Sequence, residues 1–399
     1  MSKLDELIAE LCPNGVEYKS LGEIATIARG GNFQKKDFCD RGVPCIHYGQ
    51  IYTKYGLFTD KTITFITEER AKKQKFAKTN DIIMAVTSEN IEDVCKCLAW
   101  LGNEDVAVSG HSAIISHNQN PKYLVYYFHS QMFFTQKRKL AHGTKVIEVT
   151  PDTLKSIKLP VPPLEVQREI VHILDSFTLL TAELTAELTA RKKQYEFYRD
   201  NLIKKEQHIS EVKKLADVAN IYDSLHQTPS YSNSGYSMVR VQDIKGGYLD
   251  EDKTLKVDES VWNLFTQKYT PRLNDIVVSR VGSYGNFALI PNDKCCLGQN
   301  VALIHPNINP KYLYHVLMST MTKQWINNNV KGASQKSFSL ADIKRVPVPV
   351  PKENIQQRIA EVLDNFEAIC TDLNIGLPAE IEARQKQYEY YRDLLLTFA

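Results

Sequence analysis

The feature that most constrains this chain is that its second half repeats its first. Three pairs of blocks carry the repeat: Pro121-Lys122-Tyr123-Leu124 with Pro310-Lys311-Tyr312-Leu313, Ile170–Phe177 with Ile359–Phe366, and Arg191–Asp200 with Arg384–Asp393. The first two pairs are offset by 189 residues and the third by 193. Chance does not hold one register across separated blocks, so the sequence predicts two copies of one unit, about residues 1–208 and 209–399.

Each copy is predicted to have a mixed first part and a helical second part. The mixed part contains short β-rich runs, such as Asp81–Val86 and Asp275–Ser279, and a helical stretch after each Pro-Lys-Tyr-Leu. Prolines near 160 and 349 then end the preceding element before a long helix begins. The predicted fold class is therefore α+β. The expected boundaries are 1–160 and 209–348 for the globular parts and 161–208 and 349–399 for the helical parts.

A heptad seam runs along each predicted helix. From Ile170 to Leu202 the seam residues alternate in steps of four and three, the pattern of a coiled coil. The second helix starts identically, but four extra residues near Gly376 and Pro378 form a stutter that predicts a kink or a break. We expect the helices to pack antiparallel, with a globular part at each end. The residues expected to pair them are Leu174, Phe177, Leu184, Leu188, Tyr195, Tyr198, Leu363, Phe366, Tyr388 and Tyr391.

Composition narrows the class of protein without naming a partner. A net charge of +2 is compatible with nucleic-acid binding and equally with many other functions. The absence of a long apolar run predicts a cytoplasmic protein with no membrane contact. The eight cysteines show no zinc spacing, so we expect reduced structural thiols and no metal.

Motifs for catalysis are missing from the sequence. Val161-Pro162-Pro163-Leu164 lacks the amide or carboxylate of an adenine-methyltransferase tetrapeptide. No glycine-rich cofactor loop, Walker loop or His-Glu-x-x-His motif is present. The sequence therefore predicts a protein that is not an enzyme.

The ordered, duplicated motifs resemble the specificity subunits of type I restriction–modification systems over essentially the whole chain. The similarity rests on Leu21-Gly22-Glu23-Ile24-Ala25, on Val43–Ile46 with Gln50-Ile51, on the Pro-x-Pro, Gln167 and Ile170–Phe177 series, and on the block at 191–200. The resemblance implies two target-recognition domains, each reading one half of an asymmetric double-stranded DNA site. It also implies helices that set the spacer and dock two methylation subunits. S-adenosylmethionine, ATP and Mg are then expected only in the methylation subunits and the restriction and translocation subunits, and no cofactor in this chain.

The Thr-Ala-Glu-Leu sequence occurs twice at residues 181–188. Ordinary helix-forming composition explains this as well as a length-setting role does, and both can hold. Each copy adds ~6 Å to a helix, between one and two base pairs of B-DNA.

Candidate DNA-contacting residues lie in polar turns and at strand ends. Arg and Gln or Asn can read base edges, whereas Lys more often meets phosphate. Plain turns without a binding role explain these segments equally well. The lysine run at 70–78 is also explained as a solvated helix face, and the repeated tyrosines as core residues between the helices. The first globular part lacks the Gln that follows Gly332 in the second. The candidates are Arg29, Asn32, Gln34, Lys35, Lys36, His47, Tyr48, Gln50, Lys72, Lys73, Lys75, Thr144, Lys145, Arg240, Gln242, Arg280, Ser283, Tyr284, Lys331, Ser334, Gln335 and Lys336.

One alternative from another functional class stays open. A coiled-coil scaffold whose globular heads bind protein partners would show the same repeat and the same heptad seam. The two functions differ in whether duplex binding weakens steeply as salt rises.

Overall fold

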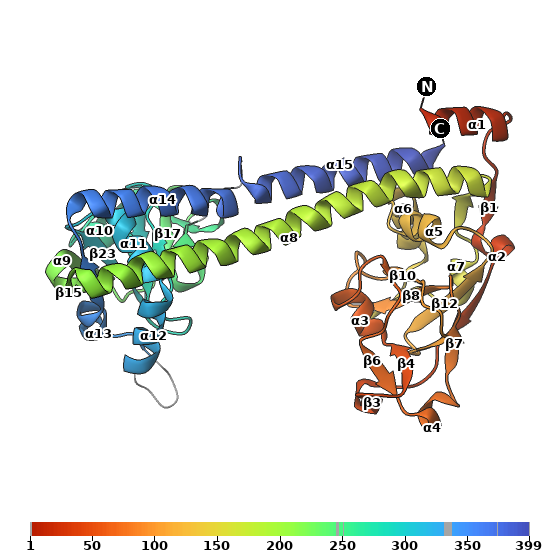
Figure 1. Ribbon diagram of the computed structural model, residues 1–399, viewed down its shortest axis with the longest axis horizontal. Coiled ribbons are helices and arrows are strands. Elements are labelled where there is room, and N and C mark those ends of the chain that lie inside the picture. Colours follow the sequence, from red (N-terminus) through yellow and green to blue (C-terminus); the bar gives the residue numbers. More distant parts are fainter. Residues whose placement is uncertain (1, 245–246, 250, 331–336, 373, 399) are drawn as a thin grey trace. The chain divides into compact units, whose positions relative to one another are not determined.

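The fold is seen in a computed structural model that describes residues 2–244, 247–249, 251–330, 337–372 and 374–398 (Figure 1). The chain divides into two compact units. Unit 1 contains residues 1–183 and 381–399, and unit 2 contains residues 184–380. The end of the second repeat thus belongs to the same unit as the first globular part.

Two five-stranded sheets form the framework of unit 1. One has the order β2-β12-β8-β10-β5 and the other the order β3-β6-β4-β11-β7. Their strands are β2 (Ala25–Arg29), β12 (Ser112–His117), β8 (Ile82–Ala85), β10 (Cys97–Trp100), β5 (Phe58–Thr59), β3 (Phe38–Cys39), β6 (Thr64–Ile66), β4 (Val43–Ile46), β11 (Val106–Val108) and β7 (Lys75–Ala77). Two-stranded pairs join β1 (Tyr18–Ser20) to β14 (Lys158–Pro160) and β9 (Thr87–Ser88) to β13 (Ile147–Glu148).

The helices of unit 1 cover these sheets and connect them. They are α1 (Lys3–Leu11), α2 (Leu21–Ile24), α3 (Tyr48–Thr53), α4 (Glu68–Ala71), α5 (Pro121–Phe128), α6 (Gln131–Leu140) and α7 (Pro151–Leu154). Asn120 caps α5, and its aromatic residues Tyr123, Tyr126 and Tyr127 are fully buried. The core of unit 1 therefore lies between α5 and the β8–β12 sheet.

Unit 2 repeats this plan. Its larger sheet has the order β16-β23-β20-β21-β18 and its smaller one β19-β17-β22. The strands are β16 (Ala219–Asp223), β23 (Val301–Pro306), β20 (Ile276–Ser279), β21 (Phe287–Leu289), β18 (Gly247–Tyr248), β19 (Leu255–Val257), β17 (Tyr236–Val239) and β22 (Cys295–Leu297), with β15 (Glu211–Lys214) paired to β24 (Pro347–Val350). The helices are α9 (Leu215–Val218), α10 (Glu259–Thr266), α11 (Pro310–Met318), α12 (Thr320–Asn329) and α13 (Leu340–Arg345).

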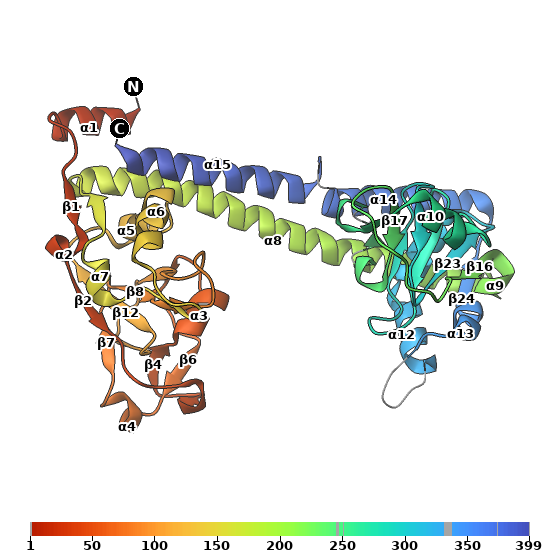
Figure 2. The same ribbon diagram turned by 180° about the vertical axis from the view of Figure 1, so that it is seen from behind.

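Long helices complete both units. The 46-residue helix α8 (Leu164–Ile209) contributes its first part to unit 1 and its second part to unit 2. In unit 1 it packs antiparallel to α15 (Leu377–Thr397), and in unit 2 antiparallel to α14 (Glu353–Thr371). Figure 2 shows the same helices from behind. The interval between α14 and α15 coincides with the predicted stutter.

The repeated sequence blocks contact one another within each unit. The hydroxyl of Tyr123 donates to the carbonyl oxygen of Pro160 at 3.0 Å, and Tyr312 donates likewise to Pro349 at 2.9 Å. Lys122 forms an ion pair with Asp175, as Lys311 does with Asp364. These contacts fasten the helix that begins with each Pro-Lys-Tyr-Leu motif to the following proline-containing strand and to the long helix, which explains why the blocks recur together.

The predicted α+β class, the duplication and the long antiparallel helices are confirmed. Beyond Tyr195 the buried residues of α8 include Arg199 and Ile203, while the seam residue Tyr198 is 42% exposed and stacks on Phe366 of α14. Leu184 and Leu188 are only partly buried. Among the described residues, no helix combines the length and apolarity that crossing a bilayer requires.

Candidate nucleic-acid interface

A cavity of about 700 Å³ opens on unit 1 where β2, α3 and the turn after β11 meet. It brings together many of the predicted DNA-contacting residues. Its polar and aromatic lining consists of Arg29, Asn32, Phe33, Gln34, His47, Tyr48, Lys73, Lys75, Ser109 and His111. Because none of these side chains is a carboxylate, the cavity suits an anionic or hydrogen-bonding ligand.

Close backbone packing shapes this cavity. Gly30 donates its amide to the carbonyl oxygen of Ser112 at 2.9 Å. A Cβ on Gly30 would lie 2.2 Å from the carbonyl oxygen of Ser109, so this position requires glycine. The Ser109 hydroxyl in turn accepts from the Tyr48 amide at 2.8 Å. The start of α3 is thereby fixed against the turn after β11.

Aromatic rings form one wall of the cavity. Tyr48 lies between His47 and His111, with ring centroids 4.5 Å and 4.9 Å away. Burial lowers the pKa of His47 to about 4, so its imidazole is neutral at pH 7. Its Nδ1 accepts from the Gly49 amide at 3.2 Å, which leaves Nε2–H as a donor. A neutral imidazole donor can address a base-edge acceptor.

Unit 2 carries a cavity of about 400 Å³ at the equivalent place. It is lined by Thr228, Tyr231, Arg240, Gln242, Ser283, Gln299 and Asn300, together with small and apolar residues. Arg240 occupies the position of His47, and Gly298-Gln299-Asn300 the position of Ser109-Gly110-His111. Among its described lining residues there is again no carboxylate. The two cavities thus share a place in the fold but differ in the groups they present.

Several candidates use their polar atoms within the fold. Gln50 is 8% exposed; it accepts from the His47 amide and donates to Thr64, so it caps α3. Arg280 is paired with Asp223, and its side chain is 14% exposed. Arg240 forms a bidentate pair with Asp243 through Nε and Nη2, at 3.0 and 2.9 Å, but it still lines the unit 2 cavity. Gln50 and Arg280 are therefore better explained as structural residues than as base contacts.

The other candidates fall into four groups. In unit 1, Arg29 forms an ion pair with Glu148 at 2.9 Å but still reaches the cavity. Exposed residues outside that cavity are Lys35, Lys36, Lys72, Thr144 and Lys145. In unit 2, Tyr284 packs against the core rather than lining the cavity. Lys331, Ser334, Gln335 and Lys336 lie outside the described residues.

Sequence reasoning missed the turn between β11 and β12 and its counterpart before β23. Ser109, Gly110 and His111 line the first cavity, and Gly298, Gln299 and Asn300 the second. One signal was available in the sequence. These triplets directly precede strands that align at the repeat offset, yet the triplets themselves differ.

Exposed aromatic pairs mark the long helices. Phe197 is 64% exposed beside Tyr198, and Tyr390 is 65% exposed beside Tyr391. The paired rings meet edge to face, with centroids 5.7 Å and 5.4 Å apart. The repeat relates the pairs, so each unit presents the same apolar feature.

Comparison with known proteins places the chain in a family. A family model for the type I restriction modification DNA specificity domain matches residues 13–191 and again 209–383. The Escherichia coli type I restriction enzyme EcoR124I/EcoR124II specificity subunit is 36% identical over 258 residues, which cover 61% of this chain and 63% of that protein. The alignment thus spans less than two thirds of that relative. A putative type I restriction enzyme specificity subunit from Haemophilus influenzae is 29% identical over 313 residues, covering 75% of this chain and 77% of the relative.

A solved structure agrees on the fold. A chain from a structure titled for complex assembly and conformational transition of the type I R-M system has a TM-score of 0.61 at 16% identity. It covers 96% of this chain and 98% of its own length. Since the family model matches both repeats over most of the sequence, the chain belongs to the type I restriction–modification DNA specificity family.

Proposed function

We propose that each unit reads one half of a bipartite, asymmetric site on double-stranded DNA. The observation that carries this proposal is the pair of equivalent cavities lined without carboxylates but with different side chains. His47 and His111 in one unit correspond to Arg240 and Asn300 in the other. Arg addresses guanine and Asn adenine, whereas Lys73 and Lys75 are suited to phosphate. Two half-sites of different sequence require the same fold in both units but different side chains facing the bases.

The helices are proposed to set the spacer and dock two methylation subunits. A repeated partner requires a repeated surface, and the pairs Phe197–Tyr198 and Tyr390–Tyr391 provide one in each unit. Exposed aromatic residues are enriched at such interfaces. The methylation subunits would supply S-adenosylmethionine chemistry, and separate subunits the ATP- and Mg-dependent translocation and cleavage. This chain would supply recognition and no catalytic group.

A salt titration of duplex binding tests the recognition role. Release of counterions from DNA predicts that the logarithm of the binding constant falls linearly with the logarithm of salt concentration. A protein-binding scaffold would show no such dependence. The chain incubated alone with S-adenosylmethionine and DNA should transfer no methyl groups, whereas transfer without partners would contradict the non-catalytic role.

A second experiment tests the docking surface. Phe197→Ser should remove one of two bound methylation subunits, and Phe197→Ser combined with Tyr390→Ser should remove both, as measured by the mass of the assembly. Leu179→Ser is the control, because Leu179 is 61% exposed on α8 outside the aromatic pairs. Full assembly by the double variant would exclude this surface.

A further inference from the structure

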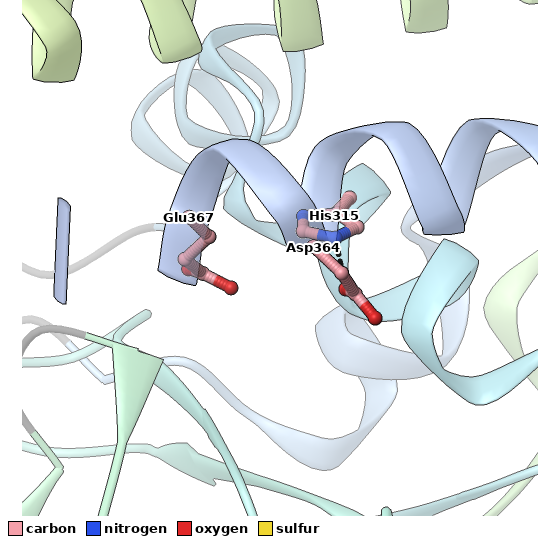
Figure 3. A group of neighbouring side chains, drawn as sticks. All are labelled: His315, Asp364 and Glu367. Atoms are coloured by element: carbon pink, nitrogen blue, oxygen red, sulfur yellow. Dashed lines mark hydrogen bonds and ion pairs between the residues drawn. The ribbon is translucent and has the colours of Figure 1, made fainter. Parts of the chain in front are cut away.

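A cluster of metal-ligating side chains lies in unit 2, apart from the proposed DNA-reading cavity. His315 comes from α11, and Asp364 and Glu367 lie three residues apart on α14 (Figure 3). One ligand atom from each residue lies within 4.8 Å of the others. His315 is fully buried. Imidazole with two carboxylates is a common ligand set for catalytic and structural transition metals.

The hydrogen bonds around His315 orient its ring. Its Nδ1 lies 3.0 Å from the hydroxyl oxygen of Tyr195, and its Nε2 lies 2.8 Å from Oδ1 of Asp364. The Tyr195 hydroxyl also lies 3.5 Å from Oε1 of Glu367, and when it donates its proton there, His315 Nδ1–H donates to Tyr195. The lone pair of Nε2 in a neutral ring then faces a carboxylate oxygen. Such a pair needs a cation between its atoms, either a proton or a metal ion.

The spacing of the two atoms suits a metal ion. Ligand atoms held at ~2.0–2.1 Å from a tetrahedral metal ion, the usual geometry of Zn²⁺, are about 3.3 Å apart. The 2.8 Å between Nε2 and Oδ1 is the length of a hydrogen bond, and a shift of about 0.5 Å would open it to this separation. Tyr195 would act as the outer-shell partner that fixes the ring of a ligating histidine.

Charge and access are also compatible with a divalent ion. A cavity of about 440 Å³ adjoins the cluster and is lined by Asp364, Glu367, Asp372 and Lys311, among others. Lys311 pairs with Oδ2 of Asp364, which leaves Oδ1 for the metal. Three carboxylates would balance Lys311 and a divalent ion.

Unit 1 provides an internal comparison. The repeat places Tyr126, Asp175 and Thr178 at the positions of His315, Asp364 and Glu367. There the Tyr126 hydroxyl donates to Asp175 at 2.7 Å and lies 3.3 Å from the Thr178 hydroxyl. The same helices therefore pack without the imidazole or the second carboxylate. The ligand set is peculiar to unit 2 and is not required by the packing.

We propose that His315, Asp364 and Glu367 bind one divalent transition-metal ion of the zinc class, which fastens α14 to α11 in unit 2. Cavity water would complete the coordination. An imidazole ligand favours Zn²⁺ or Co²⁺ over Mg²⁺ and Ca²⁺, which prefer oxygen.

Metal-free full-length chain titrated with Zn²⁺ and Co²⁺ tests the site. We expect one equivalent to bind, a rise in the unfolding temperature with Zn²⁺, and a visible Co²⁺ spectrum from nitrogen and oxygen ligands. The double variant His315→Tyr with Glu367→Thr carries the residues that unit 1 has at these positions, so it should still fold. It should lose the metal binding, the rise in unfolding temperature and the Co²⁺ spectrum. Asp175→Asn is the matched control and should abolish none.

Three outcomes would overturn the proposal. The first is the absence of binding by the parent chain, and the second is unchanged binding by the double variant. The third is a sulfur-to-cobalt charge-transfer band, which would place the ion on cysteines. Should the double variant not fold, Glu367→Gln keeps the side-chain size, and undiminished metal affinity in that variant would count equally against the site.

Discussion

The ring of Phe177 stacks on the ring of Tyr391, with centroids 5.4 Å apart and planes inclined by 19°. The equivalent pair in unit 2, Phe366 and Tyr198, has centroids 5.5 Å apart and an angle of 29°. In each pair one ring comes from the first repeat and the other from the second. Asp393 and Asp200 reinforce this exchange, since each accepts a backbone amide at 3.1 Å, from Gln131 and Thr320. Each unit is therefore completed by a helix of the other repeat.

This exchange predicts that a C-terminal substitution destabilises the N-terminal unit. Tyr388 is 8% exposed and packs against Tyr126, with centroids 6.2 Å apart. Tyr388→Ala should cost about 3–5 kcal/mol of unfolding free energy, as for other buried aromatic truncations. Hydrogen exchange should report the loss in α5, far away in sequence. Tyr390→Ala, at a 65% exposed position, is the control. Unchanged protection of α5 in the Tyr388 variant would contradict the exchange of helices.

Sequence reasoning reached the architecture but not the assignment of helices to units. A heptad seam shows which face of a helix is apolar, whereas it does not show which partner covers that face. The repeat therefore predicted two units and the helix interruption near Gly376, yet not that residues 381–399 join unit 1. The heptad pattern also did not reveal that Arg199 is buried beside the Tyr195 ring, next to the seam residue Tyr198.

The candidate site divides along similar lines. Donors in polar turns were found because Arg, Asn and Gln carry the chemistry of base reading. Whether such a donor remains free to contact DNA depends on acceptors that only the folded chain brings near it. Thr64 binds the Gln50 amide in this way, and Asp223 pairs with Arg280. Ser109-Gly110-His111 matches no motif, so apart from its divergence between the repeats it is identified by its position beside the residues that follow β2.

His111 is predicted to carry sequence information. It lines the unit 1 cavity beside Tyr48 and contacts the Thr87 hydroxyl through Nδ1 at 3.1 Å. His111→Ala should relax recognition at one position of one half-site, with a discrimination loss of about 1–3 kcal/mol. Mapping of methylated adenines in cells that express the full enzyme would show it. A change in the other half-site would contradict the assignment.

Lys75 is predicted to act on affinity alone. Its side chain is exposed at the same cavity and suited to phosphate. Lys75→Ala should weaken binding to all duplexes alike and reduce the salt slope by about one. Competition between duplexes that differ in one half-site measures both effects. Loss of affinity for only one of these duplexes would instead make Lys75 a base-reading residue.

The stability of unit 1 should depend on pH through His47. Its pKa falls from a usual value of 6.5 to about 4 on folding, chiefly because the ring is buried. Between these values the unfolded chain binds the proton and the native chain does not, so acid favours unfolding. The contribution of neutral His47 is complete above pH 6.5 and is lost progressively towards pH 4, on the order of 1–3 kcal/mol.

His47→Asn isolates this contribution. Asn retains an acceptor for the α3 cap and does not titrate. Denaturant unfolding of both proteins between pH 7 and pH 4.5 should show a shallower acid loss for the variant. Parallel pH profiles would exclude His47 as the source.

The length of α8 should set the spacing between the half-sites that the chain recognises. Residues 181–188 lie inside this continuous helix, so deleting Thr185–Leu188 removes about 6 Å of it. Four residues are close to one helical turn, so the two remaining parts of the helix are rotated only slightly relative to each other. We expect a spacer shorter by about one base pair, with both half-sites unchanged, because the reading cavities lie outside α8. Methylation mapping of the deletion variant measures the spacing and the bases together. Altered half-site bases with an unchanged spacer would show that the helix does not control the distance.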